Sequence, residues 1–179
     1  MNPRKTIRLS AKNYLGQAAI FVTLCCLERR RHFEHADSCR ATLEILRETS
    51  TTRSFALHAY CFMPDHLHLL VEGLSPTSDF LNFIKAFKLR SSRAFTRNHH
   101  APLWQDKFFD HILRKPDAYE SVCLYIWMNP VRAGLAKQLG EYPFAGSFTR
   151  QILSSASNIT PWCPPKSQGP LRKAGPTKT

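Results

Sequence analysis

The 179-residue sequence predicts an α+β fold in which helices pack against an antiparallel sheet. Apolar runs rich in β-branched and aromatic residues, typical of strands, alternate with segments whose apolar residues recur at helical spacing. The segments follow one another in the order β-α-β-β-α-β-α. Two βαβ-like units with helices on one side are typical of a ferredoxin-like sandwich. We therefore expect this sandwich, followed by one further helix.

Each element follows from its own pattern. Strands are expected at about 18–28, 54–62, 66–72 and 105–113, and helices at about 36–49, 77–97 and 117–129. In the long second helix, Phe80, Phe83 and Phe87 share one face, which predicts that they are buried. Pro116 suits the start of the last helix. Asn129 precedes a proline and should end that helix, because the residue before a proline avoids helical geometry.

Length and composition indicate a single domain, which we place at residues 1–150. Residues 151–179 are rich in proline, serine and lysine, and no acidic residue follows Glu141, so this basic tail is expected to be disordered. Lysine and arginine number 25 against 13 acidic residues, a formal charge of +12. Such an excess favours a polyanionic partner, although basic surfaces also occur on proteins that bind no nucleic acid.

Two features bear on the compartment. The six cysteines form no CxxC pair and mostly lie in apolar runs, which is typical of reduced core residues and predicts a cytoplasmic protein. The apolar run 18–27 after a basic start resembles a signal peptide, but Glu28 and three arginines follow it instead of a cleavage site. A membrane span needs about 20 apolar residues. We therefore interpret the run as a buried strand and expect no membrane partner.

His66 and His68 lie one residue apart in a predicted strand. Because side chains alternate across a strand, both histidines project from the same face, and Leu67, Leu69 and Val71 point into the core. Two imidazoles on a rigid strand can supply half the coordination shell of a divalent metal. The alternative is a structural pair that is hydrogen-bonded to its neighbours.

Tyr125 and Asn129 are four residues apart and therefore share one face of the last turn of the predicted helix. A phenol and a carboxamide on one face offer a nucleophile and a hard oxygen ligand. Placed over the two histidines, they would form a metal site with an attacking hydroxyl beside it. Asp65 faces away from the histidine pair and is expected to serve the turn before the strand.

Three segments of the chain resemble one known family. They are Met63–Val71 (MPDHLHLLV), Tyr125–Leu135 (YI, two variable residues, then NPVRAGL), and Leu103–His111 together with Arg114. These segments are similar to the signatures of the REP-associated tyrosine transposases, which belong to the IS200-like, single-tyrosine HUH transposase superfamily. HUH stands for His, a bulky apolar residue and His. The resemblance covers roughly residues 18–148.

The resemblance implies the same sandwich and a metal-dependent single-stranded DNA endonuclease and strand transferase. His66, His68 and Asn129 would hold Mg²⁺ or Mn²⁺, which polarises the phosphate. Tyr125 would attack the phosphate to give a 5′-phosphotyrosine and a free 3′-hydroxyl. The expected partner is single-stranded DNA with REP-like hairpins. The protein itself could be a monomer or a homodimer.

Basic residues outside these motifs are candidates for phosphate binding. The long helix carries cations that lack acidic partners at i±4, and unpaired positive charge on one face suits phosphates. The candidates are Lys85, Lys88, Arg90, Arg93 and Arg97 on this helix, and Arg29, Arg30, Arg31 and Arg132 elsewhere. The alternative interpretations are a solvated helix face and, for Arg132, a cap on helix carbonyls.

Two other functions remain open. Ferredoxin-like domains commonly bind RNA on the sheet without catalysis, although the aromatic motif that this requires is absent here. A zinc hydrolase would activate a metal-bound water and leave Tyr125 structural, but zinc sites usually add a third His, Cys or carboxylate, and the sequence offers no close candidate. Neither alternative forms a covalent protein–DNA adduct.

Overall fold

The structure, a computed structural model, describes residues 10–114, 118–150, 152 and 162–165. Its strands are β1 (Ala19–Cys25), β2 (Phe55–Met63), β3 (His66–Gly73), β4 (Phe109–Ile112) and β5 (Ala145–Gly146). Its α-helices are α1 (Ala36–Thr52), α2 (Phe80–His99), α3 (Ala118–Trp127) and α4 (Asn129–Arg132), and its 3₁₀ helices are η1 (Ala11–Tyr14), η2 (Leu27–Arg29) and η3 (His32–Glu34). The predicted order of the main elements is confirmed. The short elements α4 and β5 were not predicted, because so few residues show no periodicity.

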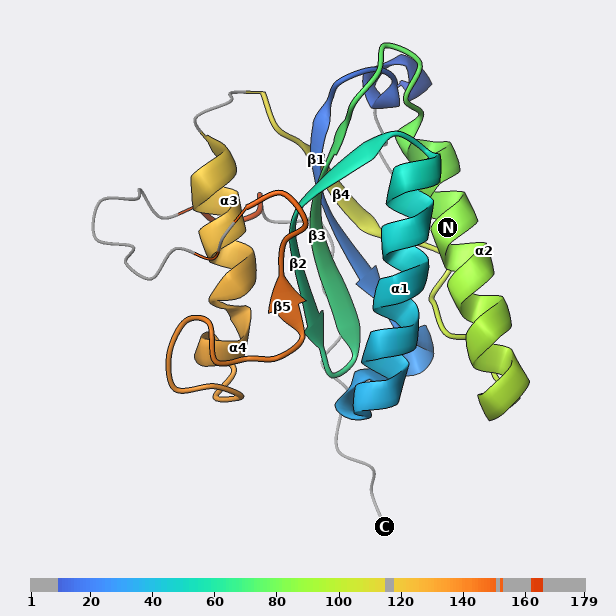
Figure 1. Cartoon of the computed structure of the whole chain (residues 1–179), viewed down its shortest axis with the longest axis vertical. Helices are drawn as coiled ribbons and strands as arrows, with labels where there is room; N and C mark the ends of the chain where they lie inside the picture. The colour runs from blue at the N-terminus through green and yellow to red at the C-terminus, as the bar shows by residue number, and fades with distance from the viewer. Residues whose placement is uncertain (1–9, 115–117, 151, 153–161, 166–179) are drawn as a thin grey trace, which may run out of the picture.

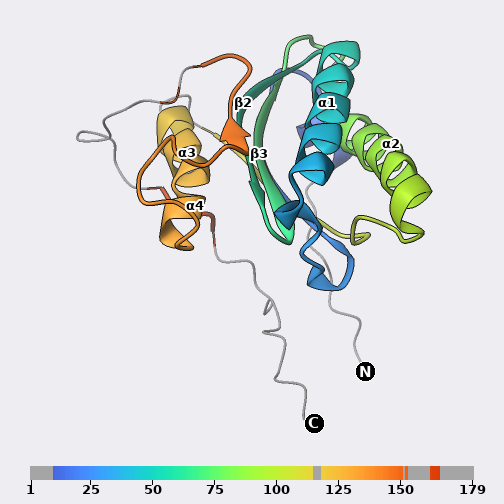
Figure 2. The ribbon, with the colours of Figure 1, turned by 60° about the horizontal axis from the view of Figure 1, so that its bottom comes forward.

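The strands form one antiparallel sheet in the order β4-β1-β3-β2-β5. Helices α1 and α2 cover one face of this sheet, whereas α3 and α4 lie against the other (Figures 1 and 2). The predicted ferredoxin-like α+β sandwich with an additional C-terminal helix is therefore confirmed.

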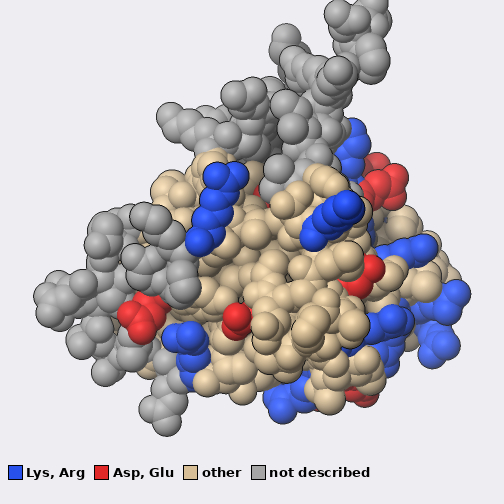
Figure 3. Space-filling model, turned by 90° about the horizontal axis from the view of Figure 1, so that it is seen from above, with Lys and Arg blue, Asp and Glu red and all other residues tan. Residues whose placement is uncertain are grey.

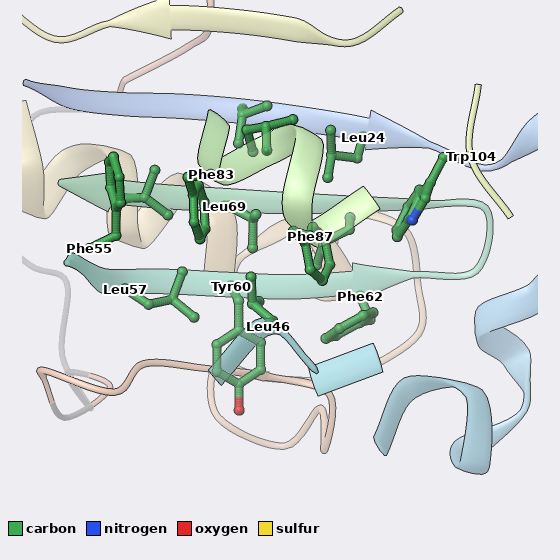
Figure 4. Packing of buried hydrophobic residues seen from close by; sticks show 14 of the residues in the cluster. Leu24, Leu46, Phe55, Leu57, Tyr60, Phe62, Leu69, Phe83, Phe87 and Trp104 are labelled. Carbon is green, nitrogen blue, oxygen red and sulfur yellow. The ribbon is translucent and has the colours of Figure 1, made fainter. Parts of the chain in front are cut away.

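The larger core lies between the sheet and helices α1 and α2. Phe83 and Phe87 of α2 belong to one buried cluster with Leu69 of β3 and Leu24 of β1, and Phe83 lies next to Leu69 (Figure 4). These residues are buried, as is Phe80, and full burial of each such side chain contributes roughly 1.5–3 kcal/mol. Packing in this core holds the side chains of the odd-numbered residues of β3 toward helices α1 and α2. Because side chains alternate along a strand, the even-numbered residues are turned to the opposite face.

A second core holds α3 on that opposite face. Ile126 and Trp127 of α3 pack with Phe21 of β1 and Leu70 of β3. The buried indole N–H of Trp127 donates to the carbonyl of Gly146 in β5 at 3.0 Å, which satisfies a group that would otherwise be costly to bury. The helix that carries the motif tyrosine is thus fixed against the histidine-bearing face of the sheet.

Helix α3 ends at Trp127, close to the predicted end at about Asn129, and a separate short helix that was not predicted follows it. Helix α4 begins at Asn129 and has Pro130 in its first turn, a position that tolerates proline. Pro130 has no N–H to offer to the carbonyl of Ile126. The side-chain Nδ2 of Asn129 lies 3.3 Å from that oxygen and 2.9 Å from the carbonyl oxygen of Tyr125. The asparagine side chain thus replaces the bond that the proline removes, and the short helix α4 can follow directly.

Other sequence expectations meet the structure only in part. All six cysteines are unpaired, and four of them are buried, as expected for reduced core residues. Within the described part of the chain, no helix is long and apolar enough to cross a membrane. Most of the tail 151–179 lies outside the described residues, so its disorder and the domain boundary stay predictions. Trp162, from the described part of this tail, packs against the second core.

Candidate active site

The two histidines of β3 converge on one point. The Nε2 atoms of His66 and His68 are 3.1 Å apart, on the sheet face that α3 covers. Leu67, Leu69 and Val71 are buried in the core on the other face, as predicted. Two ring nitrogens aimed at the same point can bind a single cation.

The second ring nitrogen of each histidine also has a partner. His66 Nδ1 lies 2.5 Å from Oδ1 of Asp65 and donates to it, because a carboxylate can only accept. His68 Nδ1 lies 2.9 Å from Oγ1 of Thr23, its neighbour in the β1–β3 register. Histidines that bind metals are oriented by such bonds from the far side of the ring.

Asp65 and Thr23 contact the histidine pair in a way that the sequence did not reveal. Asp65 was expected to serve only a turn, but its side chain reaches the ring of His66. Thr23 is a polar residue inside an apolar strand, which is a weak signal. Its role depends on the register that places it opposite His68, and that register is set by tertiary packing.

The protonation states suit metal binding. Burial is the main cause that holds the pKa of His68 well below its usual range, and charges on His66, Arg132 and Arg29 act in the same direction. His68 is therefore neutral near pH 7, which is the form that binds metals. Burial alone would raise the pKa of Asp65, but its bond to His66 and the charge of Arg29 bring the pKa below its ordinary value. The carboxylate stays ionised and keeps accepting from His66.

Tyr125 lies beside His68 of the histidine pair. The centroid of its ring is 6.2 Å from that of His68 and 5.9 Å from that of Phe21, and both contacts are edge-on. Burial raises the pKa of the phenol, whereas the charge of Arg132 lowers it. The guanidinium of Arg132 sits 4.5 Å from the centre of the ring. At neutral pH Tyr125 is thus a phenol whose proton must leave, and Arg132 favours the ionised form.

Asn129 and Arg132 both contact the end of α3. The Nη2 of Arg132 donates to the carbonyl of Tyr125 at 2.6 Å, so Arg132 caps the helix. The Nδ2 of Asn129 faces the carbonyl oxygens of α3. This orientation leaves the amide oxygen of Asn129 as the atom that could bind a metal.

Trp162 completes an aromatic cluster around the tyrosine. The centroid of its ring is 5.2 Å from that of Tyr125, 5.1 Å from that of Phe21 and 6.1 Å from that of His111. No role was predicted for this residue, since a lone tryptophan in a proline-rich tail shows no periodicity. The described part of the tail nevertheless contacts the candidate nucleophile.

The structure divides the basic candidates into two groups. Several have acidic or carbonyl partners: Arg29 with Asp65, Arg30 with Glu28, Arg31 with Glu34, Arg90 with Glu48, and Lys88 with the carbonyls of Gln105 and Asp106. Lys85, Arg93 and Arg97 are exposed along α2. Exposed ion pairs contribute only about 0–1 kcal/mol, so Arg30 and Arg31 could exchange their partners for phosphates.

The loop 26–35, which follows β1 in the chain, contacts both the β2–β3 turn next to the histidines and the last turns of α2. Phe33 N donates to the carbonyl of Pro64 in the β2–β3 turn at 3.0 Å, and the ring of His32 is 4.6 Å from that of Phe95. Helix α2 lies on the other face of the sheet from α3, but its C-terminal end and the β2–β3 turn are at the same end of the molecule (Figure 1). Arg93 and Arg97 are therefore at the end that carries the histidines.

Sequence comparisons agree with this geometry. The family model described as "Transposase IS200 like" matches residues 16–128. A REP-associated tyrosine transposase of Escherichia coli (strain K12) is 28% identical over 100 residues, which are 56% of this chain and 58% of the relative. A Haemophilus influenzae protein, provisionally named as a REP-associated tyrosine transposase, is 27% identical over 119 residues, 59% of this chain and 66% of the relative. The chain thus spans less than two thirds of each relative's length.

The fold also has a solved counterpart. A structure described as a REP-associated tyrosine transposase bound to a REP hairpin superposes with a TM-score of 0.67. The match covers 79% of this chain and 81% of that one, at 22% sequence identity. At this identity the likeness shows a common fold.

Proposed function

This chain belongs to the IS200-like transposase family, and we propose that it is a metal-dependent endonuclease and strand transferase for single-stranded DNA. The observation that carries the proposal is the convergence of His66 and His68, with the ring of Tyr125 next to that of His68. The two Nε2 atoms are 3.1 Å apart, and the rings of His68 and Tyr125 have centroids 6.2 Å apart. A possible cation site on the sheet and a nucleophile on helix α3 are thereby brought next to each other.

The nitrogen donors fit a divalent cation. Two nitrogens about 2.1 Å from one ion and at right angles around it would be about 3 Å apart, close to the 3.1 Å separation of the Nε2 atoms of His66 and His68. Mixed nitrogen and oxygen donors suit Mn²⁺ at least as well as Mg²⁺, with Asn129 Oδ1 as the third protein ligand. When bound, the ion would withdraw charge from a non-bridging phosphate oxygen.

Tyr125 makes the new bond in this scheme. Its phenolic oxygen loses its proton and attacks phosphorus, the bond from phosphorus to the 3′-oxygen breaks, and the 3′-oxygen takes up a proton. The products are a 5′-phosphotyrosine and a free 3′-hydroxyl. Because the covalent bond conserves the energy of the phosphodiester, another 3′-hydroxyl can reverse the step and join strands. Arg132, stacked on the ring, stabilises the negative charge that develops on the phenolic oxygen.

Replacing Arg132 should move the pH dependence of cleavage. Since its charge lowers the pKa of Tyr125, Arg132→Gln should raise that pKa, so that a given rate is reached only at higher pH. Each unit of increase reduces the phenolate about tenfold at neutral pH. Single-turnover rates between about pH 6 and pH 10 measure the effect. Arg132→Lys keeps the charge and is the control; equal profiles for wild type and Arg132→Gln would contradict this role.

For the partner, we propose a DNA hairpin held across the end of the molecule that carries the β2–β3 turn. Support comes from the exposed Arg93 and Arg97, and from Arg30 and Arg31, whose ion pairs are exposed. The opposite end, by contrast, has basic and acidic side chains interspersed around an uncharged centre (Figure 3). The relative of known structure is bound to a REP hairpin, which makes a hairpin the first substrate to test.

The salt dependence of hairpin binding tests this surface. The slope of log K against log salt is about −0.7 for each phosphate neutralised in a single strand and about −0.9 in a duplex such as a hairpin stem. The double variant Arg93→Ala/Arg97→Ala should weaken binding and flatten this slope by about 1.4 to 1.8 if each residue contacts one phosphate. Arg90→Ala is the matched control, because its guanidinium is engaged by Glu48 and Thr49. A double variant with the wild-type slope would show that this part of α2 is only a solvated face.

The two alternative functions predict different products. A zinc hydrolase needs three protein ligands as a rule, and the described residues contain no group of three His, Cys, Asp or Glu side chains that could hold a metal. A non-catalytic binder would leave DNA intact. Incubation of labelled hairpin DNA with the protein and Mn²⁺, followed by a denaturing gel, separates the three. Cut DNA linked to protein supports the proposal, whereas cut DNA without linkage or uncut DNA opposes it.

A further inference from the structure

The loop between β1 and α1 contains two consecutive residues with a left-handed backbone. The φ angle is +54° at Glu28 and +58° at Arg29, values that side chains other than glycine adopt only at an energetic cost. Just before them, Cys26 N donates to the carbonyl of Asp65 at 2.9 Å, which fixes the start of the loop on the β2–β3 turn. Such a strained backbone persists only where contacts with the surrounding structure stabilise it, and strained residues cluster at functional sites.

The strained backbone directs Arg29 to the carboxylate beside the histidine pair. Its Nη1 donates to Oδ2 of Asp65 at 3.2 Å, while Oδ1 of the same carboxylate accepts from Nδ1 of His66 at 2.5 Å. Arg30 and Arg31 pair instead with glutamates of their own loop. Their side chains are 57% and 60% exposed, against 32% for Arg29. Of these three adjacent arginines, Arg29 is the one that reaches the candidate metal site.

We propose that Arg29 is a positioning residue of the metal site and not a DNA contact. It fixes the carboxylate of Asp65, and the carboxylate in turn fixes the ring of His66 with Nε2 toward His68. A carboxylate held through one oxygen can turn about a broad, roughly two-fold torsion, and the bond to Arg29 removes this freedom. The inference rests on the proposed function, since it assumes that the two histidines bind a cation.

Mn²⁺ binding to the DNA-free protein tests the inference, with the paramagnetic resonance signal of free Mn²⁺ as the readout. Loss of a direct partner of a metal-bound histidine costs about 10- to 100-fold in affinity. Arg29 contacts the histidine only through Asp65, so Arg29→Gln should have a smaller effect and weaken Mn²⁺ binding by roughly 3- to 10-fold. Arg30→Gln removes the same charge from the next residue and should have less than about a twofold effect. Equal losses in both variants would overturn the inference, because general electrostatics would then explain them.

A double variant tests whether Arg29 acts through Asp65. If it does, Arg29→Gln should have no further effect on Mn²⁺ affinity in an Asp65→Ala background. Losses that simply add would place Arg29 outside this chain of contacts and refute the proposal.

A glycine variant distinguishes an effect on the metal site from an effect on the stability of the fold. Glycine takes a φ near +58° without strain, so Arg29→Gly should melt at the same temperature as wild type or higher and still lose Mn²⁺ affinity. Wild-type affinity in this variant would overturn the proposal.

The salt dependence of DNA binding distinguishes the two roles of Arg29 directly. Arg29→Gln should keep the wild-type slope, whereas loss of a phosphate contact would flatten it by about 0.7 to 0.9 and would contradict the positioning role. A failure of the metal site itself has a different signature. In that case the wild type would bind no Mn²⁺, or His66→Ala would bind it equally well, and the proposed function would fall together with this inference.

Discussion

Tyr125→Phe should abolish DNA cleavage and the covalent adduct together, and leave the fold and hairpin binding intact. The change removes one oxygen, and the ring contacts with Phe21, His68, Trp162 and Arg132 need only the ring. Loss of the nucleophile from a covalent mechanism should cost at least about 10³-fold in single-turnover rate. Cleavage of an end-labelled single strand beside a hairpin measures this.

The same helix supplies a matched control for that variant. Tyr119 lies six residues earlier in α3, and the centroid of its ring is 5.3 Å from that of His58, a histidine outside the pair. Tyr119→Phe should therefore keep a cleavage rate near that of wild type. If Tyr125→Phe cuts as fast as Tyr119→Phe, Tyr125 is not the nucleophile.

The second large effect should come from the metal ligands. His66→Ala or His68→Ala should abolish cleavage with either Mg²⁺ or Mn²⁺ while hairpin binding persists, because the cation site is lost but the basic surface is not. Asn129→Ala should weaken cleavage less, since a neutral amide is the poorest ligand of the three. Gel-based rates and binding isotherms on the same DNA measure the two quantities.

A histidine outside the pair controls for the loss of an imidazole. His58 is also buried in the sheet, but it bonds to Glu72 at 2.7 Å and to Thr149 at 2.9 Å. His58→Gln should retain cleavage. Removing the cation with EDTA should reproduce the two alanine variants, and cleavage that survives EDTA would refute the metal-centred scheme.

The sequence predicted what depends on local periodicity. Alternation along β3 correctly placed Leu67 and Leu69 in the core and both histidines on one face. Helical spacing correctly predicted the buried stripe of α2 that includes Phe83 and Phe87. These patterns are visible because each element must bury one side, whatever its neighbours are.

What the sequence missed depends on contacts between distant segments. Thr23 orients His68 through the β1–β3 register, which no local pattern specifies. The cations of α2 had no acidic partner within the helix, but Arg90 pairs with Glu48 of α1, and Lys88 bonds to carbonyls of a later loop. A search at i±4 along one helix cannot detect such partners, because they come from other elements.

The end of the tyrosine helix shows a different limit. The avoidance of helical geometry before proline is a real local preference, but Asn129 offsets it by donating its side-chain amide to the carbonyl of Ile126, which Pro130 leaves without a backbone donor. A rule about backbone preference does not include what the neighbouring side chain can supply.

The most direct test of the central claim is the chemical identity of the protein–DNA product. The protein would be incubated with a single-stranded hairpin substrate and Mn²⁺, digested, and its peptides analysed by mass spectrometry. Our account predicts a peptide that carries a nucleotide 5′-phosphate on Tyr125 and a matching DNA fragment with a free 3′-hydroxyl. A cut strand with no modified peptide, or a phosphate attached to any other residue, would contradict it.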